Sequence, residues 1–209
     1  MVRPELPYQD HYEIARNAGV DRLRAGFDTR RLEQLGAALI GDSIGLDVLC
    51  WQFRLTLEPF SMVLLPGGQE VSIVWQILVL DYLSGHPGSS PGRFVSFADF
   101  PDARGYLPTF DKRVIQRLSF GVARNPEEFV RRAEQCAGAR GSDVPLTYLF
   151  RLFPKLELQV IRHEGDEDLP PSCNILFPDN ALDLLTAECM VAAAERLASA
   201  LEGKGPARG

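Results

Sequence analysis

The stretch "VPLTYLFRLFPKLELQVIRHEGDEDLPPSCNILFPDN", residues 144–180, sets the pattern of the fold. Large apolar side chains recur at every second position of two runs, at Leu146, Tyr148, Phe150 and Leu152, and again at Leu156, Leu158 and Val160. This period is that of strands with one buried face. The intervening Phe153-Pro154-Lys155 favours a tight turn. The two runs therefore predict an antiparallel hairpin.

The end of the same stretch predicts a third strand. Pro170-Pro171 favours an extended backbone. Beyond it, Ser172 and Asn174 fall on one face of a strand, and the apolar Cys173, Ile175 and Phe177 fall on the other. The apolar face can reach the core, while Ser172 and Asn174 can present a hydroxyl and an amide to a ligand or a neighbouring loop.

Working outward, the rest of the chain mixes helices and further strands. Residues 1–40 predict two helices, one ending at Gly19 and one capped by Asp28. Residues 51–58 alternate as a strand does, and a short strand is expected at 62–65. The run at 71–84 is apolar on all sides, which favours a central buried helix.

Three later segments predict helices by their side-chain spacing and their caps. They are a helix that buries Phe110, Val114 and Leu118, one capped by Asn125, and one at about 187–202 capped by Thr186. The fold class is therefore α+β: one domain, with a small, mostly antiparallel sheet and helices packed on it. We expect a helical segment at 1–40, the α+β core at 41–202 and a disordered tail at 203–209.

Charge and composition limit the partners. The chain of 209 residues has 28 acidic and 22 Lys or Arg residues, a formal net charge of -6, so we expect no nucleic-acid partner. Its longest apolar run is shorter than the roughly 20 residues of a membrane helix and contains Gln76 and Asp81. The N-terminus has no apolar core of a signal peptide. Membrane binding is therefore not expected, and a cytoplasmic location is.

The four cysteines, at positions 50, 136, 173 and 189, include no closely spaced pair. Local zinc or iron–sulfur ligation and a disulfide framework are therefore disfavoured. The chain also has no GxxxxGK[ST], GxGxxG, GxSxG or HExxH motif. A nucleophilic Cys173 would need a base such as His163, and a buried structural thiol is the simpler interpretation.

The acidic triplet Asp166, Glu167 and Asp168 is the first candidate site. With His163 and Asp179 it places five potential ligands for a hard divalent cation within 17 positions. Neighbouring side chains of an extended segment point in alternate directions, however, so three adjacent acids rarely converge on one ion. The alternative is a solvated acidic turn between two strands.

The aromatic segment 93–110 is the second candidate. Ser96, Phe97 and Phe100 fall within it and are candidate ligand contacts, together with Asp166, Glu167, Asp168, Ser172 and Asn174. Its rings can form a ligand wall or simply pack on the core. The Gly/Pro/Ser-rich loop 84–92 before it is either a connector or a lid.

One succession of motifs resembles a known family. "WQILVLDYL", "VSFADFP", "SFG", "RLFPKLELQVI", "GDEDLPPSCNILFPDNA" and "LLTAE" follow one another over residues 70–202. This order resembles the prokaryotic domain of unknown function 3786, with a looser match in the earlier strands. The resemblance implies a cytoplasmic protein often found in anaerobes, with some relatives fused to an iron–sulfur domain. This chain has no cysteine cluster for such a centre, and the family brings no established catalytic residues.

Three functional interpretations follow. The first is a non-catalytic accessory or ligand-binding module associated with anaerobic redox or cofactor metabolism, with a groove between residues 93–106 and 165–179. The second is an enzyme that binds a divalent metal at the acidic loop 166–168. The third is a protein–protein interaction scaffold that uses the aromatic segment 93–110. The sequence names no cofactor and no specific partner for any of them.

Overall fold

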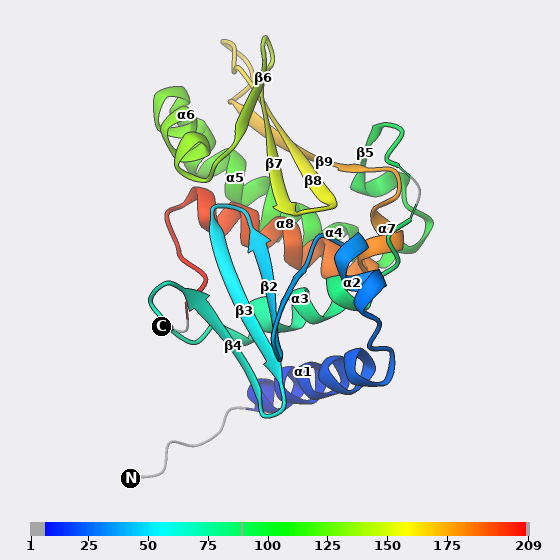
Figure 1. Cartoon of the computed structure of the whole chain (residues 1–209). Helices are drawn as coiled ribbons and strands as arrows, with labels where there is room; N and C mark the ends of the chain where they lie inside the picture. The colour runs from blue at the N-terminus through cyan, green and yellow to red at the C-terminus, as the bar shows by residue number, and fades with distance from the viewer. Residues whose placement is uncertain (1–6, 89, 208–209) are drawn as a thin grey trace.

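The computed structural model describes residues 7–88 and 90–207 and contains two antiparallel sheets (Figure 1). The first has four strands in chain order: β1 (Ala38–Ile40), β2 (Ser43–Val48), β3 (Trp51–Leu57) and β4 (Phe60–Leu65). The second runs in the order β5-β9-β8-β7-β6, with β5 (Phe94–Ser96), β6 (Ala139–Asp143), β7 (Leu146–Phe153), β8 (Leu156–His163) and β9 (Ser172–Pro178). The predicted α+β class is confirmed, but the strands form two sheets where we expected one.

The alternation in the sequence accounts for both sheets. Residues 156, 158 and 160 of β8 are buried while 157, 159 and 161 are only partly so, and residues 173, 175 and 177 of β9 are likewise buried. The predicted strands of the 144–180 stretch are therefore confirmed. The buried apolar residues of both sheets belong to one continuous core cluster.

The helices are α1 (Pro7–Ala25), α2 (Thr29–Gln34), α3 (Ile73–Ser84), α4 (Leu107–Phe110), α5 (Gln116–Phe120), α6 (Pro126–Gln135), α7 (Ala181–Leu184) and α8 (Ala187–Leu201). Short 3-10 turns lie at Phe97–Asp99, Pro101–Tyr106 and Val122–Arg124, and a π-helical stretch, Asp111–Ile115, joins α4 to α5. The predicted helix caps are present, since Asp28, Asn125 and Thr186 each accept a backbone N–H of the helix that follows.

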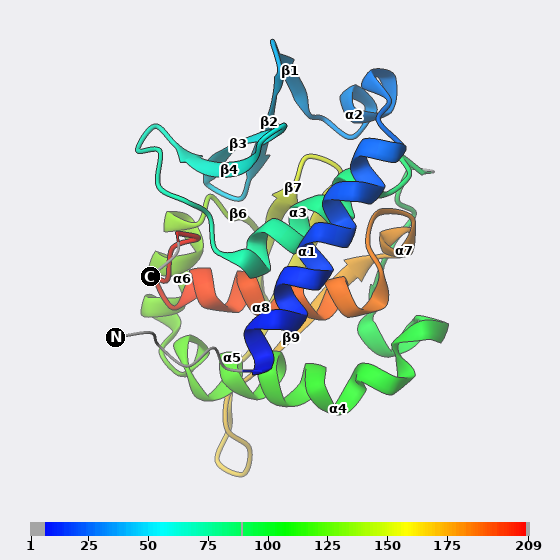
Figure 2. The same ribbon diagram turned by 90° about the horizontal axis from the view of Figure 1, so that it is seen from below.

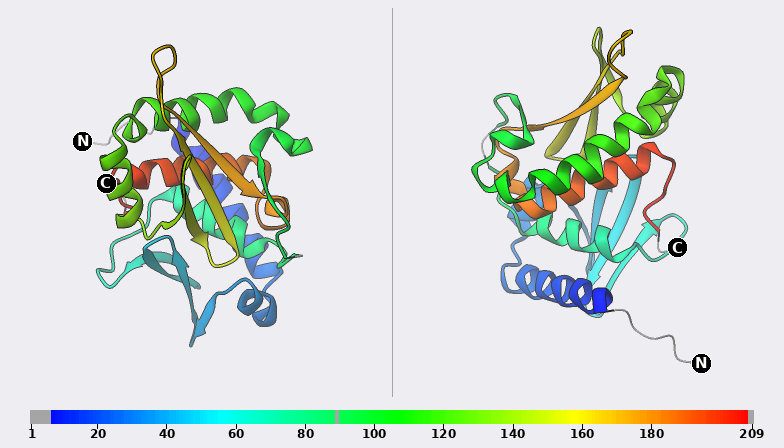
Figure 3. Two further views of the ribbon diagram at one scale, coloured as in Figure 1. Left: turned by 90° about the horizontal axis from the view of Figure 1, so that it is seen from above. Right: turned by 180° about the vertical axis from the view of Figure 1, so that it is seen from behind.

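Helix α1, helix α3, helix α8 and the helical segment 107–120 pack side by side in that order. Helix α3 is the predicted central helix, with most of its side chains buried. Helix α8 lies between α3 and the continuous helical segment 107–120, which packs below the second sheet (Figure 3). Helix α1 packs on α3 from the other side (Figure 2). The first turn of α8 thus lies among α3, α1 and the 101–106 turn.

The N-terminal segment differs from its prediction. Helix α1 continues past Gly19 to Ala25, because Gly19 meets α3: a Cβ there would lie 3.1 Å from Leu80 Cβ. The glycine serves a close helix–helix approach rather than a helix end. The predicted helical segment 1–40 also ends in a strand, β1.

The C-terminal end also differs where it is described. The Ser72 N–H donates to Pro206 O at 2.9 Å, and Val71 forms a β-bridge with Ala207. Residues 206 and 207 are therefore paired with residues 71 and 72, which directly precede α3, whereas the sequence predicts disorder over 203–209. Residues 208 and 209 lie outside the described residues.

Candidate ligand-binding pocket

The acidic triplet lies in the β8–β9 connection and closes its own turn. The Asp166 carboxylate accepts the N–H groups of Asp168, at 2.9 Å, and Leu169, at 2.8 Å. The Asp166 N–H donates to Leu169 O at 2.9 Å. This is the behaviour of an aspartate that stabilises a loop through its own backbone. Glu167 and Asp168 are exposed beside it.

The structure does not bring the predicted metal ligands together. His163 pairs with Ser172 at one end of β9, whereas Asp179 follows the other end and accepts the Gly92 N–H at 2.9 Å. A strand of this length spans about 20 Å. The described part of the chain contains no group of three or more His, Cys, Asp or Glu side chains that could hold a metal ion.

The aromatic segment packs inward. Phe97 and Phe100 are 1% and 5% exposed, and both rings contact Phe177 of β9. Ser96 caps a 3-10 turn: its hydroxyl accepts the Ala98 N–H at 3.2 Å, and its own N–H donates to Asp99. These residues are placed by core packing and capping and do not form a ligand wall.

The remaining candidates on β9 are also separated from that segment. Ser172 is exposed and Asn174 half-buried. Strand β5 pairs with residues 176–178, at the end of β9 away from the acidic turn. The 93–106 segment therefore meets β9 at residues 176–178, at the opposite end of the strand from the acidic triplet 166–168. Burial raises the pKa of Cys173 to about 12, which favours the structural thiol over a nucleophile.

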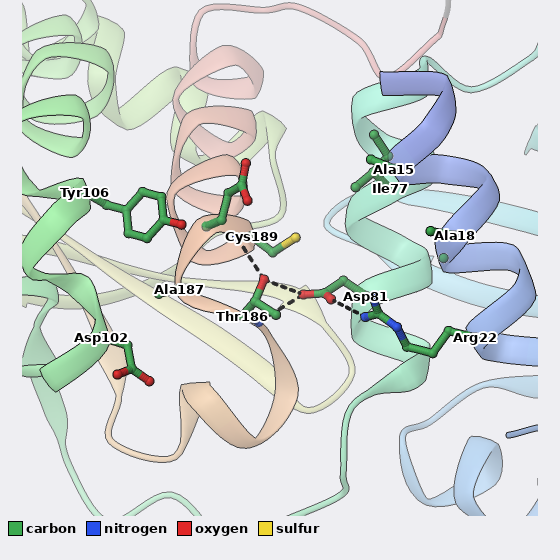
Figure 4. A pocket seen from close by; sticks show the side chains of 12 residues that line it. Ala15, Ala18, Arg22, Ile77, Asp81, Asp102, Tyr106, Thr186, Ala187 and Cys189 are labelled. Atoms are coloured by element: carbon green, nitrogen blue, oxygen red, sulfur yellow. Dashed lines mark hydrogen bonds and ion pairs between the residues drawn. The ribbon is translucent and has the colours of Figure 1, made fainter. Parts of the chain in front are cut away.

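A different pocket, of about 480 Å³, lies beside the 101–106 turn (Figure 4). It is lined by α1, α3, that turn and the start of α8. Small side chains, Ala15 and Ala18 of α1 and Ala187 of α8, leave the space open, and Tyr106 extends toward α8 from the opposite wall. A pocket of this volume is in the range of small-molecule sites.

Asp81 of α3 is held rigidly in this pocket. Its Oδ2 accepts the Thr186 N–H at 2.9 Å and the Thr186 hydroxyl at 3.1 Å, and its Oδ1 accepts from Arg22 at 3.3 Å (Figure 4). The side chain of Asp81 is 11% exposed. The same Thr186 hydroxyl accepts the Cys189 N–H and so caps α8. The charge of Asp81 is thus offset by Arg22, and the amide donors of Thr186 and Cys189 are already used.

Two other carboxylates give the pocket its net charge. Asp102 and Glu188 line it, are exposed, and form no salt bridge within the described residues. Cys189 also lines it but is 9% exposed. Burial, and then the nearby charge of Asp81, raise the pKa of its thiol to about 12. The thiol is therefore protonated at neutral pH, and the pocket is negatively charged with small apolar walls.

Sequence reasoning did not identify this pocket. One available signal was Asp81, a carboxylate within the apolar run "VWQILVLDYL". A carboxylate on a buried helix requires partners. The partners themselves come from residues 22 and 186, which the sequence does not connect.

Comparison with known families accounts for most of the chain. The family model described as Domain of unknown function (DUF3786) matches residues 29–200. The match begins well before the 70–202 span of the motifs and includes both sheets, while α1 precedes it. Comparisons with curated proteins and with solved structures found no match. Within the described residues, no helix has the length and apolar character needed to cross a membrane. Because the family model matches well over half of the chain, the chain belongs to the DUF3786 family.

Proposed function

We propose that this protein is a non-catalytic module that binds a small organic molecule in the Figure 4 pocket. The observation that carries this proposal is the pair of exposed carboxylates, Asp102 and Glu188, which form no salt bridge with any residue that the structure describes and lie on a pocket with small apolar walls. Negative charge beside apolar surface suits a short aliphatic amine. An anionic ligand would meet these carboxylates and find the amides of Thr186 and Cys189 already bonded.

The protonated Cys189 and the fully engaged Asp81 support binding over catalysis, because neither is free to act as nucleophile or base. An accessory role in anaerobic redox or cofactor metabolism, and a cytoplasmic location, belong to the proposal through the family resemblance. The metal-enzyme alternative loses support because Asp166 closes its own turn. The scaffold alternative loses support because Phe97 is buried.

Calorimetric titration with putrescine and spermidine tests the proposal, with succinate as a dianion of similar length. We expect measurable binding of the amines and none of succinate. Asp102→Asn and Glu188→Gln should each weaken amine binding up to about fivefold, the size of a partly exposed ion pair. Glu127→Gln, an exposed carboxylate on α6, is the matched control and should have no effect.

A second variant locates the binding. Ala18→Leu places a larger side chain in the pocket from an exposed helix position and should abolish binding while α1 remains folded. Amine binding that survives Ala18→Leu, or that is equal for succinate, would contradict the proposal.

A further inference from the structure

Two cysteines far apart in the sequence lie on adjacent segments of the fold. Cys50 is in the turn between β2 and β3, and Cys136 is the C-terminal cap of α6. Figures 1 and 3 show the β2–β3 turn beside the connection from α6 to β6. The Leu49 N–H donates to Leu152 O of β7 at 3.2 Å, so the turn is fastened to the second sheet.

The segment that carries Cys136 contacts the same strand. Gly138, two residues further on, lies so close to β7 that a Cβ there would be 2.7 Å from Phe150 Cε1. The Gly138 N–H also donates to Ala133 O at 2.8 Å, which closes the end of α6. Both cysteine-bearing segments therefore rest on residues 150–152 of β7.

The backbone is strained next to both cysteines. Leu49 (φ 53°) and Ala137 (φ 57°) are the non-glycine residues with positive φ in the described chain. One directly precedes Cys50 and the other directly follows Cys136. Left-handed backbone is unfavourable for side chains other than glycine, and such strain concentrates at functional sites. Leu49 and Ala137 therefore turn the chain directly beside Cys50 and Cys136.

The thiols of Cys50 and Cys136 differ in solvent exposure, and the charge of the Cys50 thiolate affects the pKa of Cys136. Cys50 is exposed, whereas Cys136 is 5% exposed. Partial burial raises the pKa of the Cys50 thiol above its ordinary value. Burial raises the pKa of Cys136 to about 11, and the charge of the Cys50 thiolate adds to this increase. Cys50 is thus the thiol that a solvent reagent reaches first. Once its sulfur is bonded and uncharged, this repulsion of the Cys136 thiolate is removed.

We propose that Cys50 and Cys136 are a redox-active pair that forms an intramolecular disulfide, joining the β2–β3 turn to the end of α6, by exchange with a low-molecular-weight disulfide. The Cys50 thiolate attacks one sulfur of the reagent, giving a mixed disulfide and one thiolate. The Cys136 thiolate then attacks Cys50 Sγ and expels the second thiolate. The protein loses two protons and two electrons, and the reagent is reduced to two thiols. This modification is independent of the ligand proposed above.

The test uses the full chain under native conditions, incubated with oxidised glutathione, quenched with acid and measured by intact mass and peptide mapping. We expect wild type to lose two hydrogen atoms in mass, with one crosslinked peptide pair containing Cys50 and Cys136. Cys136→Ser should stop at a stable glutathione adduct on Cys50. Cys50→Ser should remain unmodified.

Two controls check that the protein is folded during the reaction and that the serine variants keep the fold. Cys173 and Cys189 are buried in the same molecule and should be alkylated by iodoacetamide only after unfolding. Thermal melting checks that both serine variants are folded. Wild type that stops at the Cys50 adduct, that does not react, or that crosslinks a different pair would overturn the proposal.

Discussion

Asp81 and Thr186 form one unit across 105 positions of the chain, since a single carboxylate oxygen accepts both the backbone N–H and the hydroxyl of the threonine. The same hydroxyl accepts the Cys189 N–H at the start of α8. The hydrogen bonds that connect α3 to the start of α8 are therefore the same ones that fix the Asp81 side chain in the pocket.

Replacing Asp81 should loosen this joint. Asp81→Ala leaves the Thr186 N–H without its acceptor and removes the partner of Arg22. We expect a loss of about 1–3 kcal/mol in the free energy of unfolding, measured in urea. Asp21→Ala, on a side chain that is 77% exposed, is the control and should cost much less. Equal values for the two variants would contradict the assigned role.

The pair of Arg117 and Glu202 predicts a pH dependence. Both guanidinium-to-carboxylate contacts are 2.6 Å, and the hydrogen bonds from Arg117 hold the pKa of Glu202 below its ordinary value of 4.5. A lowered folded-state pKa stabilises the protein above the unfolded-state pKa, and this contribution is lost as the pH falls through the folded-state value.

The stability difference between wild type and Glu202→Gln should therefore be constant from pH 7 to about pH 5.5 and shrink below about pH 4.5. Urea unfolding across this range measures it. Glu127→Gln, at an exposed carboxylate, should show no such trend. A difference that grows on acidification would exclude the assigned sign.

Arg162 is among the largest buried side chains of the described residues and is 1% exposed. Its Nε donates to Ala123 O at 2.7 Å, while its carboxylate partner Glu164 has a side chain 74% exposed. Arg162→Ala should cost about 2–4 kcal/mol in unfolding free energy, since it leaves a cavity and an unpaired carbonyl.

Glu164→Ala should cost less than about 1 kcal/mol, because water can replace an exposed carboxylate. Chemical denaturation of the two variants side by side measures the asymmetry. A larger loss of unfolding free energy for Glu164→Ala than for Arg162→Ala would contradict this. It would mean that the salt bridge to the exposed Glu164 contributes more stability than the buried contacts of Arg162.

Phe97 is a candidate ligand contact and lies in the aromatic segment of the scaffold interpretation, and its packing predicts a stability effect. Its ring stacks on Phe110 with 4.4 Å between centroids. Phe97→Ser should destabilise the protein by at least about 3 kcal/mol in urea. Phe120→Ser, at a ring that is 65% exposed, should cost little. A Phe97→Ser protein as stable as wild type would show that the ring is dispensable for the core.

The sequence predicted best where the cause is local. Alternation placed β7, β8 and the buried face of β9, and side-chain capping placed the starts of α6 and α8 at Asn125 and Thr186. It failed at Gly19 and Ala207, whose roles depend on Leu80 and Val71, which are distant in the sequence. A glycine in a helix and a short polar tail look the same whether or not a distant segment packs on them.

For the candidate site, residue type alone was misleading. Asp166 looks like a ligand but completes its own turn, and Phe100 looks like a binding wall but packs on Phe177. The sequence by itself determined the α+β class, the strand faces, the central helix and the net negative charge, because these follow from side-chain period and composition. Only the tertiary structure decided that Asp81 joins Thr186 and Arg22 in a pocket, and that Cys50 and Cys136 lie on adjacent segments. Contacts between distant residues are fixed by how the helices and sheets pack together, and no local pattern encodes them.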